Sequence, residues 1–148
     1  MYRQILVSTD GSELSQKAIR TAVRLAKTTG GAVTGVYVIA PYEPPAYGEG
    51  VMYGTYITPK RYKEISERAG KKALAAVEVE AQTAGVECRK AMLTANNPWE
   101  GIIEAAKSRR CDLIVMASHG RRGLSGLLLG SETNKVLTHS KTPVLVCR

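Results

Sequence analysis

A glycine-rich segment with neighbouring hydroxyl groups is the part of this chain best suited to chemistry. It follows a short apolar run, 113–116, that is typical of a buried strand. Glycine lets a backbone approach an anion closely, and free N–H groups of a loop and of a following helix point at that anion. The pattern therefore predicts a phosphate-binding loop, although the same glycines also suit a flexible turn that packs closely. The residues concerned are Gly120, Gly123, Gly126, Gly130, Ser125, Ser131 and Thr133.

Ionisable side chains accompany this segment and also occur near the start of the chain. Arg121 and Arg122 lie in the loop, where they either contact phosphate or face solvent. His119 is interpreted as a loop residue near the ligand, because the sequence offers no nucleophile or orienting acid to pair with it. Asp10 follows the first apolar run. It either contacts the ligand or caps a helix through the spacing of Asp10 and Glu13.

Apolar runs and helical patterns alternate along the chain. Strands are expected at 5–7, 33–39, 86–93, 113–116 and 143–147. Helices are expected from 14 to the glycines at 30 and 31, over 61–84, from 97 through 106, and from 127 to about 140. Asn97 is the expected cap of the third helix, with Pro98 in its first position. Such alternation predicts a mostly parallel sheet with helices on both faces.

The segment 41–60 differs from the rest of the chain in composition. It is rich in proline and glycine, which predicts a long irregular connection. Its tyrosines either form a lid over the site or a cluster on the surface. They are Tyr42, Tyr47, Tyr53 and Tyr56.

Ligands of parallel sheets bind at the carboxyl ends of the strands, where the winding direction reverses. If the first and fourth strands are neighbours, the loops that follow them share one crevice. Thr9 and Asp10 then face the glycine-rich segment, although they come from opposite ends of the chain.

Length and charge restrict the partners of the protein. The 148 residues suit a single domain. The formal charge of +8, from 21 basic and 13 acidic residues, favours phosphorylated or polyanionic partners. The basic residues are scattered, there is no phenylalanine, and no zinc-finger spacing occurs. We therefore expect no nucleic-acid partner.

Targeting signals and cysteines indicate the compartment. No apolar run is long enough to cross a bilayer, and residues 1–8 lack the features of a signal peptide, so no membrane partner is expected. Cys88, Cys111 and Cys147 form no Cys-x-x-Cys motif. They are interpreted as reduced thiols that pack as small apolar side chains, which predicts a cytoplasmic protein.

The sequence resembles the universal stress protein family over nearly its whole length. The likeness rests on the opening residues 5–12, on 36–38, on the run 112–120 and on the closing residues 142–146. The nucleotide-binding branch of that family shows the pattern Gly-x2-Gly-x9-Gly-Ser/Thr. Here the spacing is intact, but the first position is alanine: the pattern falls on Ala117, Gly120, Gly130 and Ser131.

The resemblance implies a fold and a ligand. The fold is α/β: one Rossmann-like domain (adenine nucleotide alpha hydrolase-like) over 1–148, with an open parallel five-stranded sheet, helices on both faces and order 3-2-1-4-5. The ligand is ATP, held as a structural or regulatory ligand in a stress response, with Mg²⁺ held through the phosphates. The resemblance also implies a homodimer, in which the edge strand from Pro143 to Cys147 pairs with its counterpart.

The resemblance further assigns roles to single residues. Thr9, Asp10 and Val38 lie around adenine and ribose, with Asp10 as acceptor for a ribose hydroxyl. Met116 and Ala117 border the sugar and the α-phosphate. At Ala117 a methyl group is tolerable where φ is negative, and a positive φ would weaken ATP binding rather than the fold. The remaining contacts, mainly to phosphate, are assigned to Gly120, Arg121, Gly130, Ser131 and Thr133.

Two other functions remain open from the sequence. One is an ATP-using enzyme, either a hydrolase or an adenylyl-transfer enzyme; the Walker lysine is missing, so only slow hydrolysis is expected. The other is a non-nucleotide dimeric interaction module that acts through its dimer surface or the 41–60 segment. We expect a binding protein rather than an enzyme.

Overall fold

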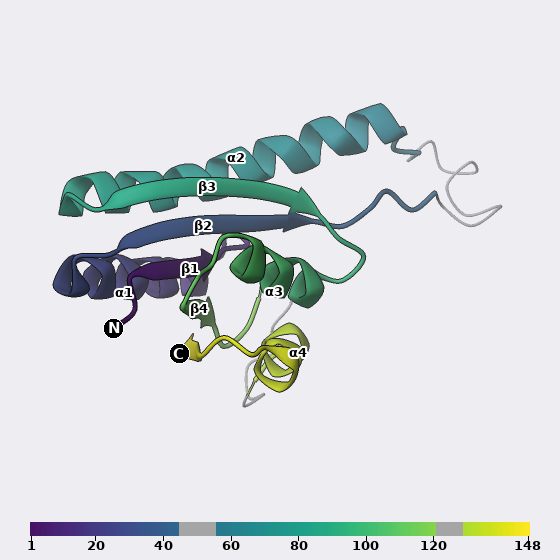
Figure 1. Cartoon of the computed structure of the whole chain (residues 1–148). Helices are drawn as coiled ribbons and strands as arrows, with labels where there is room; N and C mark the ends of the chain where they lie inside the picture. Colours follow the sequence, from purple (N-terminus) through teal and green to yellow (C-terminus); the bar gives the residue numbers. More distant parts are fainter. Residues whose placement is uncertain (45–55, 121–128) are drawn as a thin grey trace.

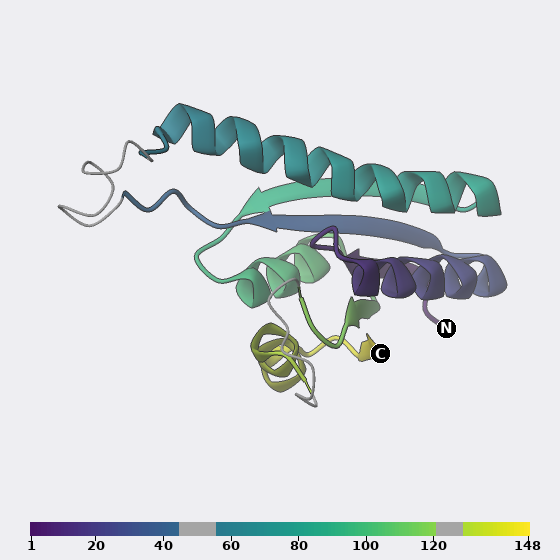
Figure 2. The same cartoon turned by 180° about the vertical axis from the view of Figure 1, so that it is seen from behind.

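The computed structural model describes residues 1–44, 56–120 and 129–148. Within them lies one five-stranded sheet whose strands are all parallel, in the order β3-β2-β1-β4-β5. The predicted sheet, its order and its two helix-covered faces are confirmed (Figures 1 and 2). The elements are β1 (Gln4–Ser8), α1 (Glu13–Thr29), β2 (Ala32–Ile39), α2 (Pro59–Ala84), β3 (Glu87–Thr94), α3 (Pro98–Ser108), β4 (Leu113–Ala117), α4 (Ser131–His139) and β5 (Val144–Cys147).

The order of the strands places the two chain halves side by side at the centre of the sheet. The chain winds outward from β1 through β2 to β3, and then returns to β4 on the other side of β1. Ile5 pairs with Leu113 and Val7 with Val115. The carboxyl ends of β1 and β4 are therefore neighbours at the point where the winding reverses, as the sequence predicted.

Strand alternation divides the core between the two faces of the sheet. Ile5 and Val7 point to one face and pack in a cluster with residues of α1 and α2. Leu6 and Ile114 point to the other face, where they pack with residues of α3 and α4. These four side chains are fully buried, with 0% of their surface exposed. The central strands are thus fixed from both sides.

The start of α1 contradicts one of the two interpretations of Asp10, namely that this residue caps the helix. The cap of this helix is Ser12, whose hydroxyl accepts a hydrogen bond from the amide of Ser15 at 3.2 Å. Asp10 instead accepts from the amide of Ser12 through Oδ1 at 2.9 Å, which closes a turn. The capping interpretation of Asp10 is therefore wrong, because the helix begins two residues later than that pattern requires.

The helix α2 begins at Pro59, two residues before the predicted start, because Thr58 caps it. Its first turns reach beyond the strands (Figures 1 and 2). Tyr42 is fixed at this end: its hydroxyl donates to the carbonyl of Ile57 at 2.9 Å, and its ring contacts that of Tyr62 at 5.5 Å. Tyr47 and Tyr53 lie outside the described residues.

The predicted start of the last helix is wrong, whereas that of the third helix is confirmed. The helix α4 begins at Ser131 rather than at 127. The residue before it, Gly130, has an extended backbone and occupies the N-cap position. Residues 127 and 128 lie outside the described part of the chain. In α3 the first position is Pro98, as predicted. The side chain of Asn97, however, donates to Glu100 at 3.1 Å and caps no amide.

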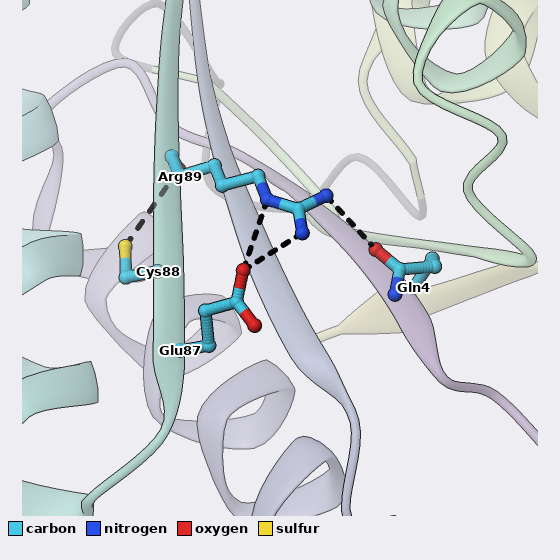
Figure 3. Close-up of polar contacts among 4 residues, drawn as sticks. All are labelled: Gln4, Glu87, Cys88 and Arg89. Atoms are coloured by element: carbon cyan, nitrogen blue, oxygen red, sulfur yellow. Dashed lines mark hydrogen bonds and ion pairs between the residues drawn. The ribbon is translucent and has the colours of Figure 1, made fainter.

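The edge strand β3 is protected by charged side chains (Figure 3). Arg89 forms an ion pair with Glu87 at 2.7 Å, and its guanidinium reaches across β2 toward the side chain of Gln4 at 3.5 Å. Charges on an edge strand discourage pairing with another chain. The opposite edge, β5, has the sequence Val-Leu-Val-Cys and carries no such charge within its bounds.

The cysteines are free thiols in this structure. Cys111 is buried as expected, whereas Cys88 and Cys147 are only half-buried. Burial raises the pKa of the Cys88 and Cys111 thiols above the ordinary value, and the neighbouring carboxylates of Glu78 and Asp112 raise it further. Both thiols therefore stay protonated at neutral pH and are poor nucleophiles.

Candidate functional site

A cavity of about 220 Å³ lies at the carboxyl ends of the central strands. Its wall is formed by the residues that follow β1 and β4, by the end of β2, and by the first turns of α3 and α4. Most of the residues singled out in the sequence meet here. The predicted residues that line the cavity are Thr9, Asp10, Val38, Met116, Ala117, Gly120 and Thr133.

Asp10 joins the two halves of the site. One carboxylate oxygen, Oδ1, holds the turn before α1 by accepting from Ser12. The other oxygen, Oδ2, faces Gly120 so closely that a Cβ placed on that glycine would lie 3.0 Å from it. The loops after β1 and β4 thus meet at Asp10, and glycine at position 120 leaves space for its carboxylate.

Thr9 holds the turn at Asp10 in place through its hydrogen bonds to neighbouring elements. It is 7% exposed, and its amide donates to the carbonyl of Val36 at 3.0 Å. Its hydroxyl accepts from the amide of Gly11 at 3.1 Å and shares a hydrogen bond with the hydroxyl of Ser15 at 3.0 Å. Thr9 therefore ties the end of β1 to β2 and α1, and positions Asp10 at the cavity.

One side of the cavity is apolar. Val38 near the end of β2 lines the cavity together with Pro98 and Ile102 of α3. Met116 of β4 lines it as well. The helix approaches the sheet closely because Gly101 has no side chain: a Cβ there would lie 3.1 Å from the methyl carbons of Val38. This arrangement forms an apolar slot of the kind that suits a planar ring.

Ala117 occupies the position where the phosphate-binding pattern has glycine. Among the described residues, the non-glycine residues with positive φ are Tyr2 and Arg110. Ala117 is the last residue of β4 and has ordinary strand backbone. Its methyl group therefore causes no backbone strain, which removes the physical reason to expect a distorted loop.

Two of the predicted phosphate donors are engaged within the protein. The amide of Gly130 donates to the carbonyl of Ser118 at 2.7 Å. The hydroxyl of Thr133 lies 3.0 Å from the carbonyl oxygen of Ala117, to which it donates. These bonds fix the start of α4 against the end of β4. The first amides of a helix have no partner inside it, so the donors at this helix start are the amides of residues 131–133.

The remaining predicted residues either do not line the cavity or lie outside the described residues. Gly130 and Ser131 belong to the start of α4 but are not among the residues that line the cavity. Arg121, together with Arg122, Gly123, Ser125 and Gly126, lies outside the described residues. Tyr42 and Tyr56 do not line the cavity.

Several lining residues were missed by the sequence interpretation. Val36 shares a strand face with Val38, so period-two alternation could have identified it. Pro98 and Ile102 became part of the site only through the packing of α3 on the sheet, for which the sequence gives no local signal. The full set of missed residues is Ser8, Ser15, Val36, Tyr37, Pro98, Ile102 and Glu132.

His119 lines the cavity as a loop residue, in agreement with its predicted location. Its Nδ1 atom lies 3.0 Å from the hydroxyl oxygen of Ser118. Ser118 is only 2% exposed and is not part of the cavity wall. The hydroxyl of Ser118 is therefore held beside His119 inside the protein and is not exposed at the cavity wall.

The described lining residues carry negative charge. Asp10 and Glu132 are the carboxylates of the wall, and neither lysine nor arginine occurs among the lining residues that the structure describes. Positive potential at the cavity comes instead from the N-terminal ends of α3 and α4. In the described ranges, no group of three or more metal-ligating side chains is assembled. None of the helices in the described ranges has the length and apolar character needed to span a membrane.

The chain is similar to known proteins along its whole length. It matches the universal stress protein family over residues 1–148. A universal stress protein of Methanocaldococcus jannaschii is 32% identical over 151 residues, which cover 100% of this chain and 83% of that protein. A universal stress protein of Thermus aquaticus is also 32% identical, and the match covers 100% of both chains.

Solved structures share the fold. Another protein of Methanocaldococcus jannaschii superposes with a TM-score of 0.80 at 27% identity, covering 99% of this chain and 96% of that chain. A universal stress protein in complex with cAMP has a TM-score of 0.72 at 24% identity, covering 99% and 97% of the two chains. One from Archaeoglobus fulgidus in complex with dAMP has a TM-score of 0.69 at 21% identity, covering 99% and 98%.

Proposed function

We propose that this chain, which belongs to the universal stress protein family, binds an adenine nucleotide in the cavity at the ends of β1, β2 and β4. The observation that carries the proposal is the meeting of Asp10 with Gly120 beside an apolar slot and a helix start. The solved relatives that hold cAMP and dAMP support the same class of ligand.

The proposal gives each part of the wall a task. The adenine ring lies in the slot between Val38 and Pro98, where apolar contact excludes water. Asp10 accepts a hydrogen bond from a ribose hydroxyl. The phosphates lie at the start of α4, where the amides of residues 131–133 have no partner inside the helix and the helix dipole favours an anion. Gly130 and Thr133 contribute by fixing this helix start rather than by donating to phosphate.

ATP is the proposed nucleotide, with Mg²⁺ held through its phosphates rather than by a cage of protein carboxylates. The protein acts as a cytoplasmic binding protein in a stress response, with the nucleotide as a structural or regulatory ligand. It works as a homodimer whose subunits pair through β5. We expect binding rather than turnover, because His119 of the cavity wall lies beside Ser118, whose side chain is buried and does not line the cavity.

The test is the affinity of purified protein for ATP, ADP and AMP by isothermal titration calorimetry. Asp10→Asn keeps an oxygen for the turn at Ser12 but removes the charged acceptor. Because a hydrogen bond to a charged group contributes about 1.5–3 kcal/mol, affinity should fall roughly 10- to 100-fold. Glu13→Gln is the matched control, since this exposed residue of the same turn does not line the cavity.

The result that contradicts the proposal is the absence of affinity for all three nucleotides, which would favour an interaction module instead. Mass spectrometry of the small molecule released by heat gives an independent answer, since a bound nucleotide should appear there. Phosphate release at about 1 per second or faster would show an enzyme rather than a binding protein.

A further inference from the structure

The carboxylate of Glu132 lies between the N-terminal ends of two helices at the wall of the cavity. It belongs to the first turn of α4, yet its Oε2 accepts a hydrogen bond from the amide of Trp99 in α3 at 2.9 Å. Its Oε1 lies 4.0 Å from the ammonium group of Lys135. Both of these side chains are substantially exposed, so this ion pair neutralises little of the charge.

The bond to Trp99 holds this negative charge in one place. The amide of Trp99 is one of the first amides of α3, which have no partner inside their own helix. An anion at such a position is stabilised by the helix dipole and by a charge-assisted hydrogen bond. The anion site at the start of α3 is therefore already filled by a carboxylate of the protein itself.

A phosphate chain at the start of α4 experiences two opposing effects. The amides of residues 131–133 attract it, whereas the fixed carboxylate of Glu132 in the same helical turn repels it. The described lining residues include no lysine or arginine to offset this repulsion, and Asp10 adds a second negative charge. Repulsion grows with the charge of the ligand, so it is larger for a triphosphate than for a monophosphate.

We propose that Glu132 lowers the affinity of the site for nucleoside polyphosphates more than for monophosphates, and so reduces the preference of the site for ATP. This inference rests on the proposed function, because it concerns the same cavity. The carboxylate acts as a fixed charge that each additional phosphate must approach, while the base and ribose contacts stay the same for all members of the series.

The variant Glu132→Gln isolates this effect. Glutamine has the same length, and its amide oxygen still accepts from Trp99, so the contact between α3 and α4 is retained. Titration calorimetry with ATP, ADP and AMP is carried out at low ionic strength with EDTA, so that no divalent cation masks the phosphate charge. The affinity for ATP should rise roughly tenfold, that for AMP should change less, and ADP should be intermediate.

Glu100→Gln is the matched control. This glutamate lies in the first turn of α3, as Glu132 lies in the first turn of α4, and its replacement changes the net charge by the same amount. Its side chain bonds to Asn97 at 3.1 Å and does not line the cavity. The ratio of ATP to AMP affinity should therefore stay as in the unmodified protein.

The emission of Trp99, the one tryptophan of the chain, reports whether the helix contact survives. Its ring lies 4.6 Å from that of His139, so a shift of α3 against α4 changes the environment of the indole. Unchanged emission together with a higher ATP to AMP ratio supports the proposal. The ratio separates charge selection from a structural role, because a merely loosened site weakens all three nucleotides together.

Three results overturn the inference. Binding with an unchanged ratio in Glu132→Gln overturns the role of Glu132 and leaves the proposed function standing. Equal weakening of all three nucleotides with altered Trp99 emission means that Glu132 only joins the helices. If neither the unmodified protein nor the variant binds any of the nucleotides, the proposed function fails and the inference fails with it.

Discussion

Two residues of the turn after β1 have separate tasks. Ser12 accepts from the amide of Ser15 and so begins α1. Asp10 closes the turn with one oxygen and presents the other to Gly120. From the sequence alone, Asp10 could either cap the helix or contact the ligand, because an acidic residue three positions before a glutamate fits both roles. At the scale of single residues, stability and ligand affinity should therefore be separable here.

Substitution of the capping residue tests this separation. Ser12→Ala removes the acceptor for one of the first amides of α1, which should lower the free energy of unfolding by about 1 kcal/mol. Nucleotide affinity should stay nearly constant, since Ser12 does not line the cavity. Urea unfolding measures the first quantity and titration calorimetry the second. Ser12→Asn, which restores a capping oxygen, should recover the stability; a loss of affinity without a loss of stability would contradict the division.

Much of the site could be predicted at this scale, but its hydrogen bonds could not. Thr9, Asp10 and Ala117 follow or end predicted strands, and parallel strands bring such residues to one edge of the sheet. Gly130 and Thr133 were expected to donate to phosphate, yet they donate to Ser118 and Ala117. Which carbonyl lies near a donor depends on how α4 packs on β4, and no local pattern encodes that distance.

At the scale of elements, close contact between helices and strands positions the cavity. Gly35 at the centre of β2 lies directly under α2: a Cβ placed on it would be 3.1 Å from both methyl carbons of Val77. Val77 is fully buried. The long helix therefore rests on the backbone of β2 at this point, and the same strand ends at the cavity with Val38.

A double-mutant cycle tests this contact. Gly35→Ala forces a methyl group into occupied space and should destabilise the protein by about 1–3 kcal/mol. Val77→Ala leaves a cavity and should destabilise it by roughly 2 kcal/mol. In the double variant the new methyl group occupies the space that Val77 left, so the combined loss should be smaller than the sum. Additive losses in urea unfolding would mean that the two positions are not in contact.

Element types followed from periodicity, whereas some boundaries did not. The predicted helix over 61–84 begins at Pro59, because Thr58 supplies its cap. The last helix begins at Ser131 instead of 127, since the amide of Gly130 is bonded to Ser118 and the chain enters the helix only afterwards. Both corrections concern positions where a cap or a tertiary hydrogen bond, rather than an apolar repeat, decides where the helix begins.

At the scale of the whole molecule, the two edges of the sheet differ. The edge strand β3 carries Glu87, Arg89 and Lys90, and charged side chains of this kind discourage pairing. The other edge, β5, is apolar, and Leu145 is 38% exposed. An uncharged edge strand that is open on one side is suited to pairing with another strand, which favours β5 as the contact between two copies.

The hydrogen bonds of β5 identify which of its backbone groups are available for such pairing. The carbonyl of Pro143, just before β5, accepts from the amide of Ile114 in β4, and the carbonyl of Cys147 accepts from the amide of Ser118, just after β4. Because alternate residues of a strand direct their backbone groups to opposite sides, Val144 and Val146 direct theirs away from β4. The amide of Val146 can therefore be removed without breaking a bond inside the sheet.

Val146→Pro should convert a dimer into the 16.0 kDa monomer. Proline is tolerated in an edge strand where the lost N–H faces outward, so the subunit should still fold, while a second β5 loses a donor at the centre of the contact. Light scattering coupled to size exclusion measures the mass, and circular dichroism checks the fold. Val146→Ala shortens the same side chain but keeps the amide, so it should remain dimeric. A proline variant that stays dimeric would place the subunit contact elsewhere, and an unmodified protein with the monomer mass would end the dimer prediction, whatever the cavity binds.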